Sequence, residues 1–237
     1  MNVMMRNEQV DGLRSCPVCG GIRFISAKVL WPRLICEWQL TPAEVDYINR
    51  QQGTSCASCG NNMRAMALAN AIMDAFSFKG SFANFCKSGL SLRVLEINRA
   101  GNLTGFLRQL SEHTLIEYPK FNMQELDIPT GVYDLVIHSD TLEHVPNPVR
   151  GLSECRRVLK IGGNCIFTIP IIVDRMSRDR AGLVPSYHGS SDVLAQDQIV
   201  CTEFGVDFWK IVLGAGFRFC GLQSFEYPAA LAVVARK

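Results

Sequence analysis

The 237-residue sequence has almost no excess of either charge, because 24 Lys and Arg face 22 Asp and Glu, a formal net charge of +2. Such a balance produces no strong field toward a phosphate backbone, so binding to nucleic acid is not expected. Long hydrophobic runs are also missing: the run 165–173 contains Pro170 and is shorter than the roughly 20 residues that span a bilayer. Residues 1–11 lack the apolar stretch of a secretory signal. We therefore expect a cytoplasmic protein without a membrane-spanning segment.

Ten cysteines stand out in this otherwise ordinary composition. Because a cytoplasmic compartment keeps thiols reduced, they indicate a metal site and buried apolar thiols rather than disulfides. Two C-x-x-C-G units occur at 16–20 and 56–60, and each can direct two thiolates at one tetrahedral ion. The spacing predicts a structural Zn²⁺ site with the ligands Cys16, Cys19, Cys56 and Cys59. Cys36, in the unusually long gap between the units, is an alternative ligand, and unligated thiols are the alternative to a metal site.

Helix-start and turn signals divide the chain into two modules and a linker. The stretch 41–44, Thr-Pro-Ala-Glu, has the pattern of a capping box and predicts a helix that ends near Gly53. Good helix formers then fill residues 62–78. Gly and Ser recur between 79 and 91. We therefore predict a metal-binding module at 1–78, a linker at 79–91 and a second domain at 92–237.

From residue 92 strand and helix patterns alternate, which indicates an α/β domain with a mostly parallel, doubly wound sheet and an antiparallel C-terminal strand. An irregular insertion at 171–201 interrupts the alternation and has the length typical of a substrate lid. Strands are predicted at 92–97, 114–118, 133–138, 164–169, 217–227 and 230–235, and helices at 103–110, 146–159 and 204–213.

Four motifs carry a resemblance to a known family: Val-Leu-Glu-Ile at 94–97, Tyr-Asp-Leu-Val-Ile at 133–137, Leu-Glu-His-Val at 142–145 and Arg-Val-Leu-Lys-Ile-Gly-Gly at 157–163. In this order they make residues 92–237 resemble the class I methyltransferases that use S-adenosylmethionine, in particular the type 11-like group. The resemblance implies a Rossmann-like fold and methyl transfer from that cofactor to an acceptor. A nicotinamide dehydrogenase is disfavoured because no G-x-G-x-x-G follows the first strand.

The resemblance also implies roles for the residues around the first strand. Glu96 would receive the ammonium group of the cofactor, directly or through water. The next loop has three spaced glycines in the family, but here Asn98, Ala100 and Gly101 occupy that region. Asn tolerates a left-handed backbone and Ala is small, so an altered loop that still binds cofactor is one alternative. A lost cofactor site is the other.

Further cofactor contacts are implied along the carboxyl edge of the sheet. Glu117 would pair with the ribose hydroxyls, and Asn122 and Met123 would lie against the adenine. The step from Glu117 to Asn122 is too short for the helix that usually intervenes. Ser139 and Asp140 would lie beside the cofactor and its methyl group, although helix capping is an equally good interpretation of Asp140.

Methyl transfer requires alignment more than a dedicated base. His188 in the insertion is the candidate base for a hydroxyl or ammonium acceptor. Arg175, Arg178 and Arg180 could grip an anionic group of the substrate, with simple solvation as the alternative. We expect a small-molecule or saccharide-type acceptor. The alternative function is a non-catalytic, zinc-containing scaffold with a degenerate cofactor site.

Overall fold

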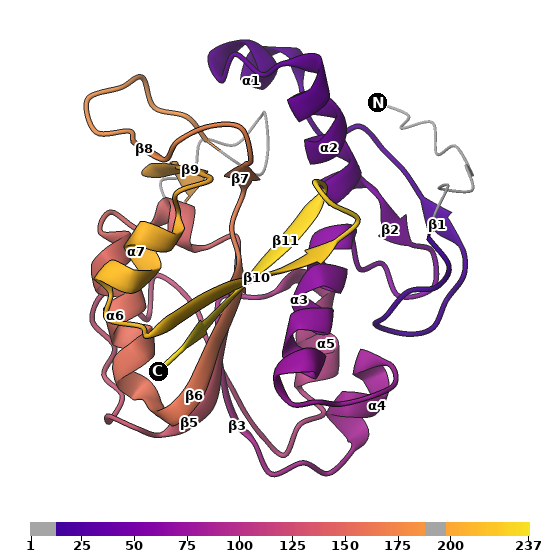
Figure 1. The fold of residues 1–237 in the computed structure, drawn as a ribbon, viewed down its shortest axis with the longest axis vertical. Coiled ribbons are helices and arrows are strands. Elements are labelled where there is room, and N and C mark those ends of the chain that lie inside the picture. Colours follow the sequence, from indigo (N-terminus) through magenta and orange to yellow (C-terminus); the bar gives the residue numbers. More distant parts are fainter. Residues whose placement is uncertain (1–12, 188–197) are drawn as a thin grey trace.

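A twisted six-stranded sheet forms the centre of the protein in the computed structural model, which describes residues 13–187 and 198–237 (Figure 1). The strand order is β10-β11-β6-β5-β3-β4. Strands β4, β3, β5 and β6 run parallel, and β11 pairs antiparallel with both of its neighbours. The predicted α/β fold with an antiparallel C-terminal strand is therefore confirmed. The strands are β3 (Arg93–Ile97), β4 (Glu112–Ile116), β5 (Tyr133–Ser139), β6 (Leu159–Thr168), β10 (Phe219–Phe225) and β11 (Ala230–Arg236).

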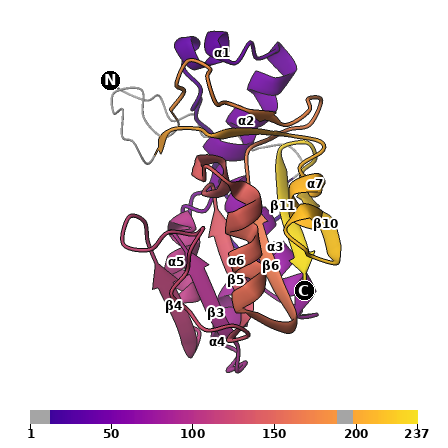
Figure 2. The ribbon, with the colours of Figure 1, turned by 90° about the vertical axis from the view of Figure 1, so that its left-hand side faces the viewer.

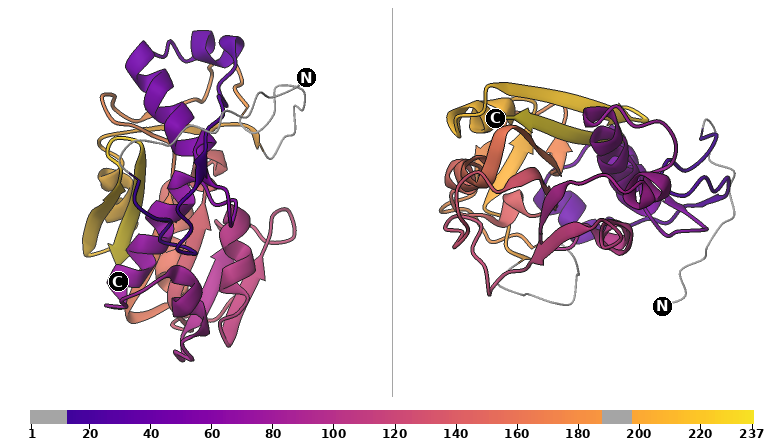
Figure 3. Two further views of the ribbon diagram at one scale, coloured as in Figure 1. Left: turned by 90° about the vertical axis from the view of Figure 1, so that its right-hand side faces the viewer. Right: turned by 90° about the horizontal axis from the view of Figure 1, so that it is seen from below.

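Helices cover both faces of this sheet, as expected for strands that are apolar on both sides. Val94 and Leu95 are adjacent in β3 and belong to different hydrophobic clusters, because successive side chains of a strand point to opposite faces. The view from below shows the two helical layers on either side of the strands (Figure 3). One layer contains α3 (Met63–Ala75), α4 (Phe82–Lys87) and α5 (Thr104–Leu107), and the other contains α6 (Pro148–Val158) and α7 (Trp209–Gly214).

Helix α3 joins the cysteine-rich part of the chain to the sheet. Asn62 caps the helix by accepting a hydrogen bond from the Ala65 N–H at 3.0 Å. The helix packs on β6, β10 and β11, and Met63, Met66 and Leu68 are fully buried. One hydrophobic cluster therefore contains residues of the cysteine units, α3 and the sheet. The domain boundary near residue 78 stays a prediction.

A cap covers the carboxyl ends of the parallel strands (Figure 2). It combines two segments distant in sequence, namely α1 (Pro32–Glu37) with α2 (Pro42–Gly53), and the small sheet of β7 (Ile171–Ile172), β8 (Arg178–Asp179) and β9 (Thr202–Gly205). The predicted capping box is present at the start of α2: the Thr41 N–H donates to Glu44 Oε2 at 2.7 Å, and the Glu44 N–H donates to Thr41 Oγ1 at 3.3 Å. The shorter elements are β1 (Phe24–Ile25), β2 (Ser55–Cys56) and the 3₁₀ turns η1 (Gly101–Leu103) and η2 (Leu142–His144).

The helix predicted at 204–213 is partly wrong. The buried segment Thr202–Gly205 is β9, which pairs with both β7 and β8, and the helix begins only at Trp209. Tertiary pairing has overridden the local helical pattern here. None of the helices within 13–187 and 198–237 combines the length and the apolar character that crossing a membrane requires.

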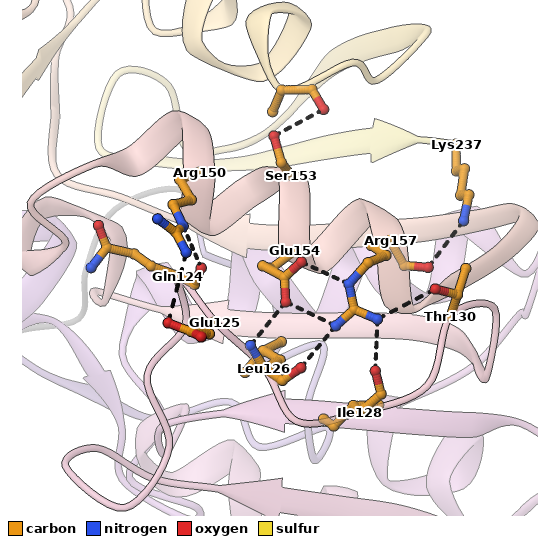
Figure 4. A network of polar contacts seen from close by, with 11 residues as sticks. Gln124, Glu125, Leu126, Ile128, Thr130, Arg150, Ser153, Glu154, Arg157 and Lys237 are labelled. Carbon is orange, nitrogen blue, oxygen red and sulfur yellow. Dashed lines mark hydrogen bonds and ion pairs between the residues drawn. The ribbon is translucent and has the colours of Figure 1, made fainter.

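The connection between β4 and β5 contains no helix, as the short spacing predicted, and Arg157 of α6 holds it in place (Figure 4). Its guanidinium donates to Ile128 O at 2.7 Å, to Leu126 O at 2.8 Å and to both oxygens of Glu154. Glu154 Oε2 in turn accepts from the Leu126 N–H at 2.9 Å. Arg157 also lowers the pKa of Glu154 by hydrogen bonding. This network fixes the loop that carries Asn122 and Met123.

Replacing Arg157 should destabilise the protein. Arg157→Ala removes charge-assisted hydrogen bonds from a partly exposed site, and we expect a loss of about 2 kcal/mol and a melting temperature lower by roughly 5 °C. Arg157→Lys should recover only part of the loss, because an ammonium lacks the planar fork. The control is Arg33→Ala, at an exposed ion-paired arginine of α1, which should change the melting temperature little. Equal melting curves for Arg157→Ala and wild type would contradict this role.

Candidate functional site

The four predicted cysteine ligands lie together. The sulfur atoms of Cys16, Cys19, Cys56 and Cys59 are all within 4.8 Å of one another, with Cys16 Sγ 3.7 Å from Cys59 Sγ and Cys19 Sγ 3.6 Å from Cys56 Sγ. A tetrahedral ion with sulfur ligands at about 2.3 Å separates those sulfurs by about 3.8 Å. The cluster thus has the dimensions of a four-thiolate metal site. Cys36 is exposed in α1 and is not part of it.

Two tight turns create the cluster. Gly20 and Gly60 follow the second cysteine of each unit with φ values of +79° and +69°, a conformation that side chains rarely adopt. The N–H of each glycine closes its turn on the carbonyl of the first cysteine, at 2.7 Å to Cys16 O and 2.8 Å to Cys56 O. Two N–H groups also donate to the sulfurs: Gly21 N lies 3.4 Å from Cys19 Sγ, and Asn61 Nδ2 lies 3.4 Å from Cys59 Sγ.

Glu96 is the second-last residue of β3 and is fully buried. Its Oε1 accepts from the Ala100 N–H at 2.8 Å and from the Thr104 hydroxyl at 2.6 Å, while Oε2 contacts His113 Nε2 at 2.8 Å. The carboxylate thus holds the loop that follows β3 in place. It lines none of the three cavities near this edge of the sheet. Its contact with an ammonium group stays a prediction.

The loop after β3 has the backbone that the sequence suggested. Asn98 has φ +56° and Gly101 has φ +56°, so two residues take the left-handed conformation without a run of glycines. Asn98 Oδ1 accepts from the Tyr118 N–H at 2.9 Å, and Nδ2 lies 3.4 Å from Thr141 Oγ1. The Asn98 side chain therefore ties the ends of three neighbouring strands together. Glu117 is exposed and forms an ion pair with Arg99 at 2.9 Å.

Two cavities open at this edge of the sheet and contain most of the predicted cofactor residues. The edge cavity, of about 540 Å³, is lined by residues that include Asn98, Asn122, Met123 and Asp140. The loop cavity, of about 360 Å³, is lined by residues that include Ala100, Gly101, Ser139, Asp140 and Arg64. The structure thus brings seven of the predicted cofactor residues, from the loops after β3, β4 and β5, to one edge of the sheet together with Arg64 of α3. Glu96 and Glu117 line neither cavity.

Asp140 stands between these cavities, because it lines both. It follows β5 with φ +44°, a strained conformation for a residue with a side chain. Its carboxylate forms an ion pair with Arg64 of α3 and lies 3.4 Å from Gln52 Nε2. Burial lowers the pKa of Arg64 to about 10. The sequence analysis missed Arg64, although a single arginine within the apolar stretch 63–73 is a signal that could have found it.

Glu143 is the second site residue that the sequence analysis did not single out. Its side chain is fully buried and lines the edge cavity. Within the described parts of the chain neither carboxylate oxygen has a hydrogen-bond partner, and His144 Nε2 lies 3.7 Å from Oε1. Burial raises the pKa of Glu143 to about 7, and the charge of Arg64 acts in the opposite direction. A buried carboxylate without a hydrogen bond among the described residues is costly, so Glu143 indicates a binding or catalytic site.

The insertion at 171–201 contains the candidate base and three arginines that are candidates to bind the substrate. His188 lies outside the described residues, so its proposed role as a base is not tested. Arg178 and Arg180 both pair with Glu203 of β9, and Arg175 pairs with Glu44 of α2 at 2.6 Å. These three guanidinium groups bind carboxylates of the chain itself, and nothing here supports the interpretation that they grip the substrate.

Comparison with known proteins bears on the same region. Residues 77–167 match the family model described as a methyltransferase domain. A sarcosine/dimethylglycine N-methyltransferase of Halorhodospira halochloris is 29% identical over 107 residues, which are 44% of this chain and 38% of that protein. A ubiquinone biosynthesis O-methyltransferase of Nitrosococcus oceani is 27% identical over 81 residues, 34% of each chain. The chain therefore matches only about a third of the length of these curated relatives.

Among solved structures, a 1,6-didemethyltoxoflavin-N1-methyltransferase of Burkholderia thailandensis, with bound 1,6-didemethyltoxoflavin and S-adenosylhomocysteine, is similar with a TM-score of 0.45 and 16% identity. The match covers 90% of this chain and 95% of that chain. The match to the methyltransferase domain model includes β3, β4, β5 and nearly all of β6, that is, the four parallel strands of the sheet.

Proposed function

We propose that the protein is an S-adenosylmethionine-dependent methyltransferase that acts on a small-molecule acceptor and carries a structural Zn²⁺ on Cys16, Cys19, Cys56 and Cys59. The observation that carries the proposal is the group of charges at the carboxyl edge of the sheet: the partly buried pair of Arg64 and Asp140, and the buried carboxylate of Glu143, which has no hydrogen bond among the described residues. Glu143 and Asp140 lie inside the segment that matches the methyltransferase family model.

The residues around the two cavities suit the chemistry of this cofactor. S-adenosylmethionine carries a methyl group on a positively charged sulfur, an ammonium, a carboxylate and an adenosine. Arg64 would bind the carboxylate and Asp140 the ammonium, because charge-assisted hydrogen bonds are the strongest available there. Asn122 and Met123 would hold the adenine in the edge cavity. A buried carboxylate such as Glu143, which has no hydrogen bond within the described part of the chain, favours a cationic ligand nearby.

The chain itself contributes alignment and exclusion of water. Methyl transfer from a sulfonium needs the acceptor atom held in line, and such positioning supplies much of the rate enhancement. The loop after β3 is held by Glu96 from below and by Asn98 from the side, so its backbone is pre-organised. The cap of α1, α2 and β7–β9 covers the carboxyl edge, where the acceptor would meet the cofactor. His188 remains the candidate base for the acceptor proton.

The names of the two curated relatives support a small-molecule acceptor, since one contains sarcosine and dimethylglycine and the other ubiquinone biosynthesis. One relative is named an N-methyltransferase and the other an O-methyltransferase.

The first test is calorimetric titration of zinc-replete protein with S-adenosylmethionine and, separately, with S-adenosylhomocysteine. We expect micromolar binding of both. Arg64→Gln should weaken the binding of S-adenosylhomocysteine at least about tenfold, because the loss of a buried charge-assisted contact costs about 1.5–3 kcal/mol. The control Arg108→Gln changes an exposed arginine at the end of α5 and should leave the affinity unchanged.

Melting curves of both variants show whether the protein is folded. No binding of either compound to folded wild-type protein would contradict the proposal and favour the non-catalytic scaffold. Equal affinities of wild type and Arg64→Gln would remove Arg64 from the cofactor site.

A further inference from the structure

A third cavity, of about 360 Å³, lies between the cap and the carboxyl edge of the sheet. We call it the cap cavity. Its walls are mainly apolar and include Trp31, Leu34, Trp38, Ile48, Ile171 and Ile172. Its polar residues include Gln52, Arg64 and Asp140, which are bonded to one another through Asp140. A pocket of this size with apolar walls and a few convergent polar groups is typical of small-molecule sites.

The walls come from the chain between the two cysteine units and from the segment after β6. Leu34 and Trp38 of the first segment pack with Ile172 and Val200 of the second in a small hydrophobic cluster that is separate from the two main clusters of the sheet. Neither segment forms the cavity alone. The 29–52 segment therefore has a task besides connecting the two cysteine units.

Arg175 locks these two segments together, so the cavity exists before any ligand binds. Its guanidinium donates to both carboxylate oxygens of Glu44, at 2.7 and 2.6 Å, and to the carbonyls of Trp38 and Gln39 at 2.7 and 2.8 Å. Arg175 also lowers the pKa of Glu44. On the opposite side, Trp38 Nε1 donates to Ser186 Oγ at 2.8 Å. Preformed walls reduce the entropy lost when a ligand binds.

Asp140 connects the cap cavity with the cofactor region, because it lines this cavity as well as the edge and loop cavities. Any ligand that fills the cap cavity therefore reaches the carboxylate that also faces the proposed cofactor. Its other end would lie against tryptophan and aliphatic side chains. A saccharide needs polar partners around its ring, whereas ten of the fourteen described lining residues are aliphatic, tryptophan or proline, and the others are Gln51, Gln52, Arg64 and Asp140.

We infer that the cap cavity is the acceptor site and that the acceptor is a small, uncharged molecule whose buried part is an aromatic or other apolar ring, with its polar atom directed at Asp140. This inference rests on the proposed function, because it takes the edge and loop cavities as the cofactor site. It assigns recognition of the acceptor to residues 29–52 and to β7.

The test uses 2-naphthol as an apolar ring with one hydroxyl and methyl glucoside as a saccharide. Binding to the full chain, with and without S-adenosylhomocysteine, is measured by ligand-observed NMR. We expect 2-naphthol to bind and methyl glucoside not to bind. Ile48→Trp fills the cavity and should weaken 2-naphthol binding at least tenfold. Val45→Trp, at a half-buried position of the same helix that does not line the cavity, should not.

A second pair of variants tests the cavity without introducing a larger side chain that could prevent folding. Trp31→Ala removes an aromatic wall and should also weaken 2-naphthol binding, whereas Trp209→Ala on α7 should not. The affinity for S-adenosylhomocysteine should stay within about twofold in all four variants. Absence of 2-naphthol binding, tighter binding of methyl glucoside, or equal binding by Ile48→Trp and wild type would overturn the inference. Binding of 2-naphthol that depends on Ile48, in a protein that does not bind S-adenosylhomocysteine, would instead contradict the proposed function alone.

Discussion

Stripping the metal with a strong chelator should lower the melting temperature by at least about 10 °C and abolish binding of S-adenosylhomocysteine. Structural zinc sites contribute about 10–16 kcal/mol of binding free energy in small domains, and that energy is folding energy. In this protein Cys16, Val18 and Cys56 belong to the same hydrophobic cluster as α3 and the sheet. Loss of the ion should therefore disturb the core and not only the cysteine turns.

The same loss should reach the cofactor site through two contacts. The Gly60 carbonyl accepts a hydrogen bond from Asn102 Nδ2 at 2.8 Å, which joins the second cysteine turn to the loop after β3. Arg64 lies only five residues after Cys59, in the first turn of α3. We therefore expect calorimetry to show loss of binding together with the fall in melting temperature.

Two cysteine variants provide the matched comparison. Cys59→Ser should reduce the zinc content, measured by elemental analysis, from one ion per chain, and should reproduce the effect of the chelator. Cys36→Ser changes the exposed cysteine of α1 outside the cluster and should keep one ion per chain. Full zinc content in Cys59→Ser, or a chelator-treated protein with unchanged melting, would contradict a structural role for the metal.

Glu143 should make the protein less stable as the pH rises. Burial raises its pKa in the folded state to about 7, whereas the unfolded chain releases this proton near the ordinary value of about 4.5. Between these two values the unfolded state binds fewer protons, so the free energy of unfolding falls as the pH rises through this window. The shift corresponds to about 3 kcal/mol, with Arg64 and His144 as the charged or titratable neighbours.

The measurement is chemical denaturation of wild type and Glu143→Gln between pH 4.5 and 8. The difference between the two should be small and constant near the lower limit and should change by up to about 3 kcal/mol in favour of the variant toward pH 8. Glu125→Gln, at a glutamate whose side chain is 82% exposed, is the control and should follow the wild type. Parallel profiles for wild type and Glu143→Gln would show that Glu143 is ionised at the same pH in both states.

The local patterns of the chain predicted the sheet well where the strands are long and apolar. The strands at 133–138 and 164–169 correspond to parts of β5 and β6, because apolar β-branched runs bounded by turns have few alternatives. The secondary structure of 204–213 was predicted only in part, because its first residues pair with β7, more than 30 residues earlier in the sequence. The spacing of the two C-x-x-C-G units predicted which four cysteines lie together, and the pairing of β1 with β2 brings the two turns side by side.

The site divides in the same way. Asn98, Asn122 and Asp140 could be placed at one edge because the carboxyl ends of parallel strands meet there. The sequence analysis did not single out Arg64 and Glu143. Their importance depends on the burial of Glu143 and on its position near Arg64, and both are properties of the packed helices and strands rather than of neighbouring residues.

The sequence by itself determined the α/β alternation, the two C-x-x-C-G turns and the motifs of the family resemblance, since each depends on residues close together in the chain. Only the tertiary structure decided that Glu96 supports a loop, that the insertion arginines pair within the chain, and that residues 29–52 meet β7 to enclose the cap cavity. The pairing of Arg175 with Glu44 and the walls of the cap cavity depend on segments more than a hundred residues apart, whereas Glu96 and the pairs of Arg178 and Arg180 depend on how nearby loops and strands fold back on one another. Local sequence patterns contain neither kind of information.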